Sequence, residues 1–390
     1  MNTPASPLLD ARSSALDQRQ RAVVQRVSDA ERAHILALPS NDPLDAKLRF
    51  RVEATGPELF GQPQAIRETL SLNGSTLDSI AEHLVTAVNR VVLVGCGDSL
   101  AVMVAARQAL EAMLGVPCEP VQSLEFAYYQ AELVDGRSAV IALSSSGETT
   151  RTVEALLMAQ HRGSYTVAIT NTAGSTLQTE ASTALKIEAT RVGWPTQSST
   201  AALALLLELA VRIGERRVPD QAAVLRAALD GLPDLMANLL TGVDPVIAGI
   251  AESEVAVGVR NVLFSGAGPN LATAIVGAAK VKECTTLHAV EIQVEEYHHY
   301  NSQKAGEPLF LFAPSGPSVP RAVDTARDAL RWGGRLYVVT TDGERAFDEF
   351  DATVITMPPV PEPLSPLLYL VIAQLVGYHL GLSCYAAAAR

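Results

Sequence analysis

One stretch constrains this chain more than any other, because an apolar run ends in three serines, a glycine and a glutamate before a helix-like pattern begins. The stretch reads Val140-Ile-Ala-Leu-Ser-Ser-Ser-Gly-Glu-Thr-Thr-Arg-Thr-Val-Glu154, which predicts a strand, a loop and a helix start. Backbone N–H groups at a helix start, with nearby hydroxyls, can surround a phosphate without a lysine. We therefore expect a phosphorylated small molecule to bind at Ser144, Ser145, Ser146, Thr149 and Thr150.

The alternative for this loop is an ordinary strand–helix connection in which a serine or threonine caps the helix. One hydroxyl is enough for a cap, so four or five together favour phosphate. A nucleotide P-loop does not fit, since the terminal Gly-Lys-Ser/Thr is missing.

Composition places the chain among ordinary globular proteins of two or three domains, with 390 residues of which 48% are apolar. Its net charge of −12 disfavours nucleic acid and anionic membrane surfaces, because both need a basic face. The four cysteines, Cys96, Cys118, Cys284 and Cys384, have no CxxC spacing, which argues against a disulfide scaffold or a zinc site. We expect buried thiols in a reducing cytoplasm.

Targeting signals are not predicted. Residues 1–39 have no apolar core of the kind found in a signal peptide. The longest apolar runs, Ala201–Ala210 and Leu367–Ser383, are too short or are interrupted by polar residues, so they predict core helices and not membrane spans.

Four regions follow from the pattern: a helical arm at 1–62, an α/β unit at 63–218, a helical linker at 219–256 and a second α/β unit at 257–390. Each unit alternates strands and helices, which predicts a parallel sheet with helices on both faces. Three strand segments recur about 170 residues later, which indicates an internal repeat. These pairs are Arg90–Gly97 with Asn261–Gly268, Ser138–Ser144 with Pro308–Pro314, and Thr166–Thr170 with Leu336–Thr340.

A strand-order reversal in such a sheet opens a crevice at the carboxyl ends of its strands. Gly95–Ser99 and Ser144–Thr149 are expected to meet there. The second unit has Pro314-Ser-Gly-Pro-Ser318 in place of the hydroxyl loop, so it is not a functional copy of the first.

The second unit instead offers Gly277-Ala-Ala-Lys-Val-Lys-Glu-Cys284 and Glu295-Glu-Tyr-His-His-Tyr300. Lys280 and Glu283 share one helix face, and the simpler interpretation of that pair is a surface salt bridge with a solvated lysine. A metal site at His298 and His299 is disfavoured, because neighbouring residues point in different directions and no third ligand is suggested.

The quoted motifs resemble those of tandem sugar isomerase (SIS) domains, in particular the isomerase half of glutamine–fructose-6-phosphate aminotransferases and SIS-type deaminases and deglycases. The motifs are Cys96-Gly-Asp-Ser99, Leu143–Thr149, Gly277–Glu283 and a histidine sixteen residues on, from 283 to 299. The resemblance runs from about Val52 to the C-terminus. It implies an α/β fold of two tandem SIS domains, each a flavodoxin-like parallel sheet.

The resemblance also implies roles for individual residues. Glu283 falls on the proton-shuttling glutamate, His299 on the ring-opening histidine and Lys280 on the helix lysine. Phosphate contacts fall on Ser144, Ser146 and Thr149, and sugar contacts on Ser99 and Ser145. In the aminotransferases a second subunit delivers the histidine, which implies a homodimer with shared sites.

Chemistry agrees with these roles. Moving hydrogen between C1 and C2 of an open-chain sugar needs one carboxylate to remove and return a proton, and a separate acid/base to open the ring. Lys280 can hold Glu283 ionised or polarise a sugar hydroxyl. No cofactor or metal is required, because the carbonyl or imine of the substrate is the electron sink.

Three departures from the aminotransferase pattern redirect the prediction. Met1 is followed by Asn2, so we expect no glutaminase domain and no glutaminase activity; Gln197 stands where the family usually has a lysine; and the C-terminal tail ends in Arg390, which cannot form an imine. Amination of fructose 6-phosphate is therefore not expected.

The leading hypothesis is a deaminase/isomerase that converts an amino-hexose 6-phosphate, such as glucosamine 6-phosphate, to fructose 6-phosphate and ammonia. A deglycase of 6-phosphofructosyl amino acids would use the same Glu283 and His299. A non-catalytic phosphosugar sensor is the third alternative. Within the loop Ser144–Thr149, Glu148 is expected to form hydrogen bonds with the backbone, away from the ligand. Glu296 is a candidate for orienting His299.

Overall fold

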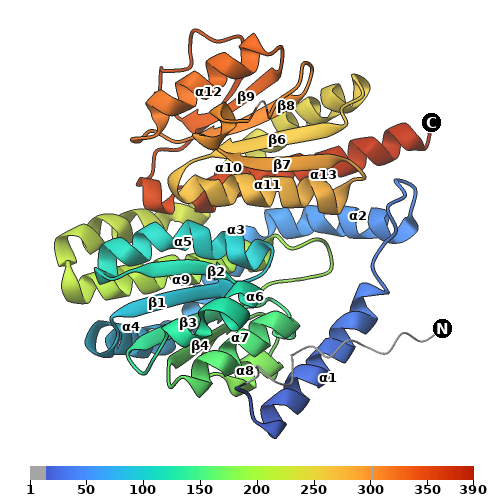
Figure 1. Ribbon diagram of the computed structural model, residues 1–390. Helices are drawn as coiled ribbons and strands as arrows, with labels where there is room; N and C mark the ends of the chain where they lie inside the picture. Colours follow the sequence, from blue (N-terminus) through green and yellow to red (C-terminus); the bar gives the residue numbers. More distant parts are fainter. Residues whose placement is uncertain (1–14, 301) are drawn as a thin grey trace.

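The computed structural model describes residues 15–300 and 302–390, so the first fourteen residues of the predicted arm lie outside the described part. Ten strands form two sheets (Figure 1). The first comprises β1 (Arg90–Gly95), β2 (Cys118–Gln122), β3 (Ser138–Leu143), β4 (Tyr165–Thr170) and β5 (Thr183–Lys186). The second comprises β6 (Asn261–Gly266), β7 (His288–Gln293), β8 (Pro308–Ala313), β9 (Arg335–Thr341) and β10 (Thr353–Met357).

Helices surround both sheets. They are α1 (Gln18–Ile35), α2 (Ala46–Phe60), α3 (Gln62–Leu72), α4 (Gly74–Ala87), α5 (Asp98–Leu114), α6 (Ser123–Glu125), α7 (Thr150–His161), α8 (Thr176–Glu180), α9 (Gln197–Arg217), α10 (Pro219–Ala256), α11 (Leu271–Cys284), α12 (Val319–Arg331) and α13 (Pro366–Ala388). Short helical turns are η1 (Phe126–Gln130), η2 (Ala131–Leu133), η3 (Gly268–Asn270), η4 (Glu296–His298) and η5 (Glu362–Leu364).

The two sheets have the same topology, which confirms the predicted fold class and the internal repeat. All pairings in both sheets are parallel. The first sheet has the order β2-β1-β3-β4-β5, and the second, taken from its β7 edge, has β7-β6-β8-β9-β10. This is the flavodoxin-like order, in which the crevice opens between the first and third strands. The three repeated segments are β1 with β6, β3 with β8, and β4 with β9.

The core is built from the alternation of side chains along the central strands. In β1, Val91 and Leu93 face one hydrophobic cluster, whereas Val92 and Val94 face another that includes residues of α7. The first cluster continues through α5, α9, α10, α11 and α13 to Phe264 of the second sheet. A shared helical layer therefore joins the two sheets into one body (Figure 1).

Close packing of α11 on α13 depends on small residues. A Cβ atom added at Gly377 of α13 would lie 2.5 Å from Cβ of Lys280, and one added at Gly381 would lie 2.7 Å from the Cys284 carbonyl oxygen. Glycine at these positions lets the backbones of the two helices approach each other. The face of α11 that carries Lys280 is thereby sealed against α13.

Two segments are long and apolar enough to cross a membrane by length and composition alone: α10 and residues 362–388, which contain α13. In the most apolar stretch of the second, 72% of the residues are buried inside the protein. The predicted core runs, Ala201–Ala210 in α9 and most of Leu367–Ser383 in α13, are buried. Their apolar composition is thus accounted for by packing.

The N-terminal arm includes one long helix, α1, docked on the first unit. Asp17 caps it through a capping box with Gln20. Val24 and Val27 bury their side chains in the same cluster as α7, and Arg19 forms an ion pair with Glu180 of α8 at 2.8 Å. Helix α1 is therefore packed against the outer helices of the first sheet (Figure 1).

Glu208 joins α9 to the linker helix α10, and it supplies a pH-dependent part of stability. Its side chain is 5% exposed and pairs with Arg212 at 2.7 Å and Arg226 at 2.6 Å. Burial alone would raise the pKa of Glu208, but the two guanidinium groups hold that pKa below its usual value. The stability that these ion pairs supply is fully present at pH values above the ordinary glutamate pKa of about 4.5. It is lost as the pH falls through the lowered pKa of Glu208 in the folded protein.

We expect Glu208→Gln to reduce the free energy of unfolding at pH 7 by about 2 kcal/mol, because the arginines stay partly solvated when they lose their partner. Urea unfolding at pH 7 and at pH 3.5 measures it, and the gap between wild type and variant should shrink at the lower pH. An equal gap at both values would contradict this assignment.

Candidate functional site

The hydroxyls of the loop after β3 point toward one another. Ser144 Oγ lies 2.9 Å from Thr149 Oγ1 and 3.3 Å from Ser146 Oγ, and it accepts a hydrogen bond from Gly147 N at 3.1 Å. Thr149 precedes α7, yet its side chain makes no cap hydrogen bond to that helix. A simple capping role therefore does not explain this loop.

Gly147 fixes the turn of the loop. Its φ is +66°, and an added Cβ would lie 2.1 Å from Ser175 Oγ. Only glycine adopts that conformation at low cost and leaves the space. The turn directs the flanking hydroxyls to one side.

Glu148 points the opposite way, as predicted. Its carboxylate accepts hydrogen bonds from Thr176 N at 2.7 Å and Thr176 Oγ1 at 2.8 Å, at the start of α8. The one acidic side chain of the loop is thus bound away from the hydroxyls, which removes its repulsion of a bound anion.

The hydroxyl loop opens into a hollow of about 320 Å³ at the carboxyl ends of β1 and β3. Five of the predicted site residues line it: Ser99, Ser145, Ser146, Thr149 and Glu283. Ser144 lies behind them and is 2% exposed. The remaining lining residues are His34, Leu38, Arg51, Cys96, Gly97, Asp98, Val102, Leu143, Arg191, Trp194, Pro195, Ser198 and Ser199.

Lys280 is the buried centre of an ion triad at the floor of this hollow. Its side chain is 1% exposed, and Nζ lies 2.6 Å from Asp98 and 2.5 Å from Glu283. Ser199 also donates to Asp98, at 3.2 Å. The prediction of a surface salt bridge with a solvated lysine is therefore wrong. Lys280 of α11 instead joins the two α/β units through its ion pair with Asp98 of α5.

The triad sets the charge of Glu283. Burial alone would lower the pKa of Lys280, but Asp98 and Glu283 raise that pKa above its ordinary value. Burial raises the pKa of Glu283, and Lys280 partly counteracts this. The Glu283 side chain is 30% exposed and lines the hollow, so the carboxylate is largely surrounded by protein but still accessible to a ligand. A carboxylate with a raised pKa is a competent general base.

Two arginines and a tryptophan in the hollow were not predicted. Arg51 lies 3.7 Å over the Trp194 ring and donates to the Gly193 carbonyl at 3.2 Å. Arg191 reaches Ser145 Oγ at 3.4 Å. Burial lowers the pKa of both guanidinium groups, which nevertheless remain charged. They provide the local positive field that an anionic ligand needs in a protein of net charge −12.

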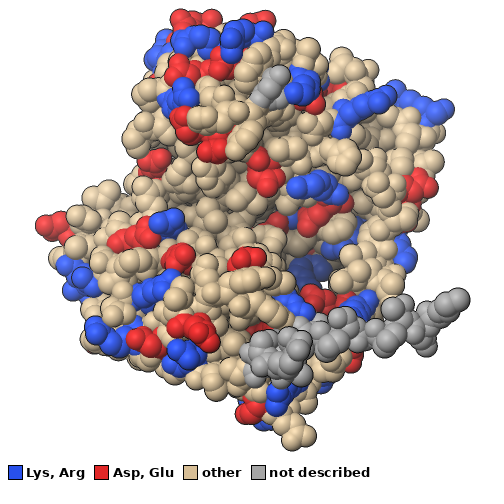
Figure 2. All heavy atoms as spheres, viewed as in Figure 1, with Lys and Arg blue, Asp and Glu red and all other residues tan. Residues whose placement is uncertain are grey.

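The charged side chains on the face of the molecule seen in Figure 2 do not form a positive region comparable with the two arginines of the hollow. Figure 2 shows acidic and basic groups intermixed over this face, without an extended basic surface. The arginines of the hollow are therefore a local feature and do not belong to a basic face.

His299 lies outside the hollow of its own chain. Its side chain is 59% exposed and lies 3.3 Å from Glu295, which also binds Arg321 at 2.7 Å. The orienting carboxylate is thus Glu295 and not Glu296. His298 is a structural residue, since its ring nitrogens contact Asp328 and Thr325, each at 3.0 Å. Across residues 15–300 and 302–390, no group of three or more possible metal ligands is present.

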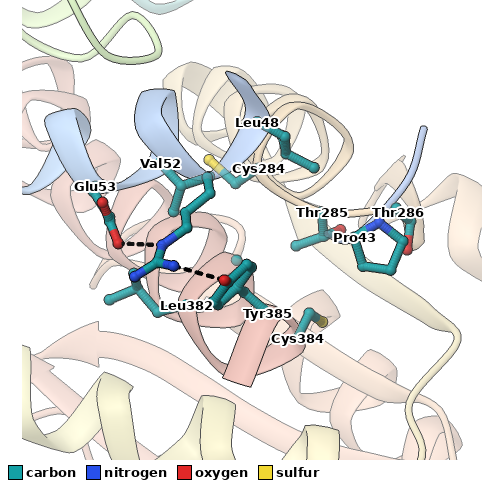
Figure 3. Close-up of a pocket in the computed structure, with 12 residues that line it drawn as sticks. Pro43, Leu48, Val52, Glu53, Cys284, Thr285, Thr286, Leu382, Cys384 and Tyr385 are labelled. Carbon is teal, nitrogen blue, oxygen red and sulfur yellow. Dashed lines mark hydrogen bonds and ion pairs between the residues drawn. The ribbon is translucent and has the colours of Figure 1, made fainter. Parts of the chain in front are cut away.

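A second, smaller pocket lies behind α11, between α2 and the end of α13. Figure 3 shows Val52, Cys284 and Leu382 along its wall. Arg49, another residue of the lining, donates hydrogen bonds to Glu53 and to Tyr385. Its lining is largely apolar and its arginine is already paired. Burial raises the pKa of Cys284, so the thiol is held neutral. The pocket lacks the groups that phosphosugar chemistry needs.

Comparison with known proteins agrees with the fold. A family model for the SIS domain matches residues 84–212. Glutamine–fructose-6-phosphate aminotransferase of Pectobacterium atrosepticum is 31% identical over 339 residues, 83% of this chain and 55% of that protein. The chain spans about half the length of the curated relatives it matches.

Solved structures share the same architecture. The C-terminal domain of glucosamine-fructose-6-phosphate aminotransferase from Francisella tularensis has a TM-score of 0.76 at 23% identity, covering 84% of this chain and 95% of that one. Glucosamine-6-phosphate deaminase from Thermotoga maritima has a TM-score of 0.60 at 19% identity, covering 82% and 94%. At these identities the likeness shows the fold alone.

The chain contains a SIS domain at residues 84–212, and it is homologous to the isomerase half of glutamine–fructose-6-phosphate aminotransferase.

Proposed function

We propose that this protein is a phosphosugar isomerase/deaminase that converts an amino-hexose 6-phosphate, such as glucosamine 6-phosphate, to a ketohexose 6-phosphate and ammonia. One observation carries the proposal: Glu283, a carboxylate with a raised pKa, lines the same hollow as the hydroxyl loop. A sugar phosphate held by that loop has its carbon chain inside the hollow. The homology to sugar-phosphate isomerising enzymes gives independent support.

Glu283 carries out the chemical step. In the open-chain sugar it takes the proton from C2 while the C1 carbonyl oxygen gains a proton to form an enol, and it returns a proton to C1 while the nitrogen loses one. The double bond then lies between C2 and nitrogen, and water adds to this imine to release ammonia. The sum is amino-hexose phosphate plus water to ketohexose phosphate plus ammonia. Lys280 and Asp98 hold Glu283 in place, and neither needs to contact the sugar.

Activity should fall with acidity because the base must be ionised. The raised pKa of Glu283 places the acid limb of kcat/KM above the ordinary glutamate range near 4.3.

The phosphate is proposed to sit against Ser144, Ser145, Ser146 and Thr149, with Arg191 beside them and Ser99 contacting the sugar. Thr149→Val keeps the shape of the side chain and removes a hydrogen bond to a charged group, worth about 1.5–3 kcal/mol. We expect KM for glucosamine 6-phosphate to rise roughly 10–100-fold, with kcat less affected. Steady-state kinetics measure it, with the exposed Thr241→Val on α10 as the matched control. An unchanged KM would exclude Thr149 from the phosphate site.

A deglycase is the second candidate, and Arg51 favours it. This guanidinium is close enough to Glu283 for the carboxylate to raise its pKa against the effect of burial, and within the described residues it has no ion pair with a carboxylate within 4.0 Å. It could bind the carboxylate of an amino acid joined to the sugar. A 6-phosphofructosyl amino acid would then give a hexose phosphate and a free amino acid, whereas the deaminase gives ammonia.

We also propose that the protein is a cytoplasmic homodimer. The four cysteines are free thiols, which fits a reducing compartment. His299 and Tyr300 are exposed, the latter at 63%, so they are available to another copy of the chain. Light scattering of the purified protein tests the dimer.

A further inference from the structure

Arg51 of α2 brings a positive charge to the part of the hollow where Glu283 acts. Both side chains line the hollow, and the helices that carry them, α2 and α11, are in contact. We infer that Arg51 is a further catalytic residue, whose guanidinium stabilises the negative charge that develops on the C1 oxygen when Glu283 takes the C2 proton. The inference rests on the proposed function, because it requires that proton transfer.

The guanidinium of Arg51 is held in place by two contacts. Its central carbon lies 3.7 Å from the centre of the Trp194 ring, and Nη2 donates to the Gly193 carbonyl at 3.2 Å. The segment that makes both contacts is itself fixed on α2. Trp194 N donates to Thr55 Oγ1 at 2.8 Å, and Gly193 N donates to Glu58 Oε1 at 3.2 Å. A cation fixed in this way needs no rearrangement during the reaction.

Most of the hydrogen-bonding capacity of Arg51 is free for a ligand. A guanidinium has five N–H donors, and the bond to Gly193 uses one of them. Within residues 15–300 and 302–390, no carboxylate lies within 4.0 Å of its nitrogens. Burial lowers the pKa of Arg51 and raises the pKa of Glu283, and each charge opposes that effect on the other. The two groups are therefore close enough to interact without forming an ion pair that would neutralise the arginine.

The other cations of the site have different tasks. Lys280 is 1% exposed, and its Nζ is bonded to two carboxylates. Arg191 reaches Ser145 of the hydroxyl loop at 3.4 Å, where the phosphate is proposed to bind. Among the described lysines and arginines, only Arg51 and Arg191 line the hollow. Arg51 is thus the cation available to the reacting carbon atoms.

The proton transfer creates the charge that Arg51 stabilises. As the C2–H bond breaks, its electron pair forms the C1–C2 double bond, and the π electrons of the C1 carbonyl move to oxygen. That oxygen carries negative charge until it gains its proton. A guanidinium stays protonated, so Arg51 acts by charge and hydrogen bonding and transfers no proton. Because the carbonyl oxygen is uncharged before the transfer, the interaction is stronger in the transition state and mainly raises kcat.

Steady-state kinetics and deuterium exchange, measured on the pH plateau of activity, test the inference. We expect Arg51→Met to lower kcat for glucosamine 6-phosphate roughly 10²-fold or more, with KM changed by less than about threefold. Loss of deuterium from C2-labelled substrate should slow to the same extent, and Arg51→Lys should retain part of the rate. Arg49→Met is the matched control, because Arg49 of the same helix is bonded to Glu53 and Tyr385 and does not line the hollow. It should behave as the wild type.

Two further readouts distinguish catalysis from a structural role. Added guanidinium ion, at concentrations too low to unfold the protein, should restore part of the rate of Arg51→Ala. Arg51→Met should also move the acid limb of kcat/KM to higher pH, because Arg51 opposes the effect of burial on the pKa of Glu283. Loss of a purely structural contact would produce neither result.

The inference is overturned if Arg51→Met leaves kcat unchanged. It is also overturned if the variant only raises KM for a 6-phosphofructosyl amino acid, because Arg51 would then bind the carboxylate of that amino acid. Failure of the proposed function gives a different result, in which the wild type exchanges the C2 deuterium but releases no ammonia. Exchange that still depends on Arg51 would then support the inference alone, and a wild type inactive in both assays would overturn both.

Discussion

Glu283→Gln is expected to abolish turnover of glucosamine 6-phosphate, with kcat reduced roughly 10³-fold or more, because the carboxylate assigned to move the C2 proton is lost. Glutamine keeps the shape of the side chain and can still accept a hydrogen bond from Lys280, whose Nζ lies 2.5 Å away. Phosphosugar binding should therefore persist.

Two measurements separate catalysis from binding in this variant. Rapid-mixing kinetics follow product formation, and calorimetric titration with the substrate follows binding. Glu252→Gln on α10, an exposed glutamate, should behave as the wild type. Full activity in Glu283→Gln would remove the assigned base and with it the proposed mechanism.

Lys280→Met is expected to have the largest effect on stability. The lysine is 1% exposed between Asp98 and Glu283, and its removal leaves two partly buried carboxylates facing each other. Loss of one partner from a buried ion pair costs about 3–5 kcal/mol. Chemical denaturation at pH 7 measures the loss. Lys282→Met is the matched control, since Lys282 is 50% exposed and 3.8 Å from Glu291; it should change stability by less than about 1 kcal/mol.

The same variant should shift the pH dependence of any remaining activity. Lys280 lowers the pKa of Glu283 against the effect of burial, so its removal raises that pKa further. The acid limb of kcat/KM then moves to higher pH. A limb that does not move, or moves to lower pH, would show that the titrating base is another group.

The sequence predicted those parts of the site that depend on local pattern. The hydroxyl loop is one such part, because strand, loop and helix start are contiguous from β3 to α7. The repeat was predictable because β1 and β6 are central apolar strands. By contrast, β7 is an edge strand with polar residues such as His288 and Glu291 at exposed positions, and it has no apolar run to recognise.

Contacts between distant segments could not be predicted in the same way. The burial of Lys280 depends on Gly377 of α13, almost a hundred residues away in sequence, and a Lys–Glu pair on one helix carries no sign of it. Asp98 lies inside the motif Cys96–Ser99 that the sequence analysis quoted. Its carboxylate could therefore have been recognised as a candidate site residue. Arg51 and His34 come from helices before the first strand, and no spacing connects them to the hydroxyl loop.

The most direct test of the central claim is product analysis of glucosamine 6-phosphate turnover in D₂O, with galactosamine 6-phosphate and a 6-phosphofructosyl amino acid alongside. Our account predicts release of ammonia and a ketohexose 6-phosphate carrying one deuterium at C1, or deuterium transferred there from C2-labelled substrate, and neither product with Glu283→Gln. Release of a free amino acid with no ammonia would instead establish the deglycase. Tight binding of every phosphosugar with no product would contradict an enzymatic role and make the protein a sensor.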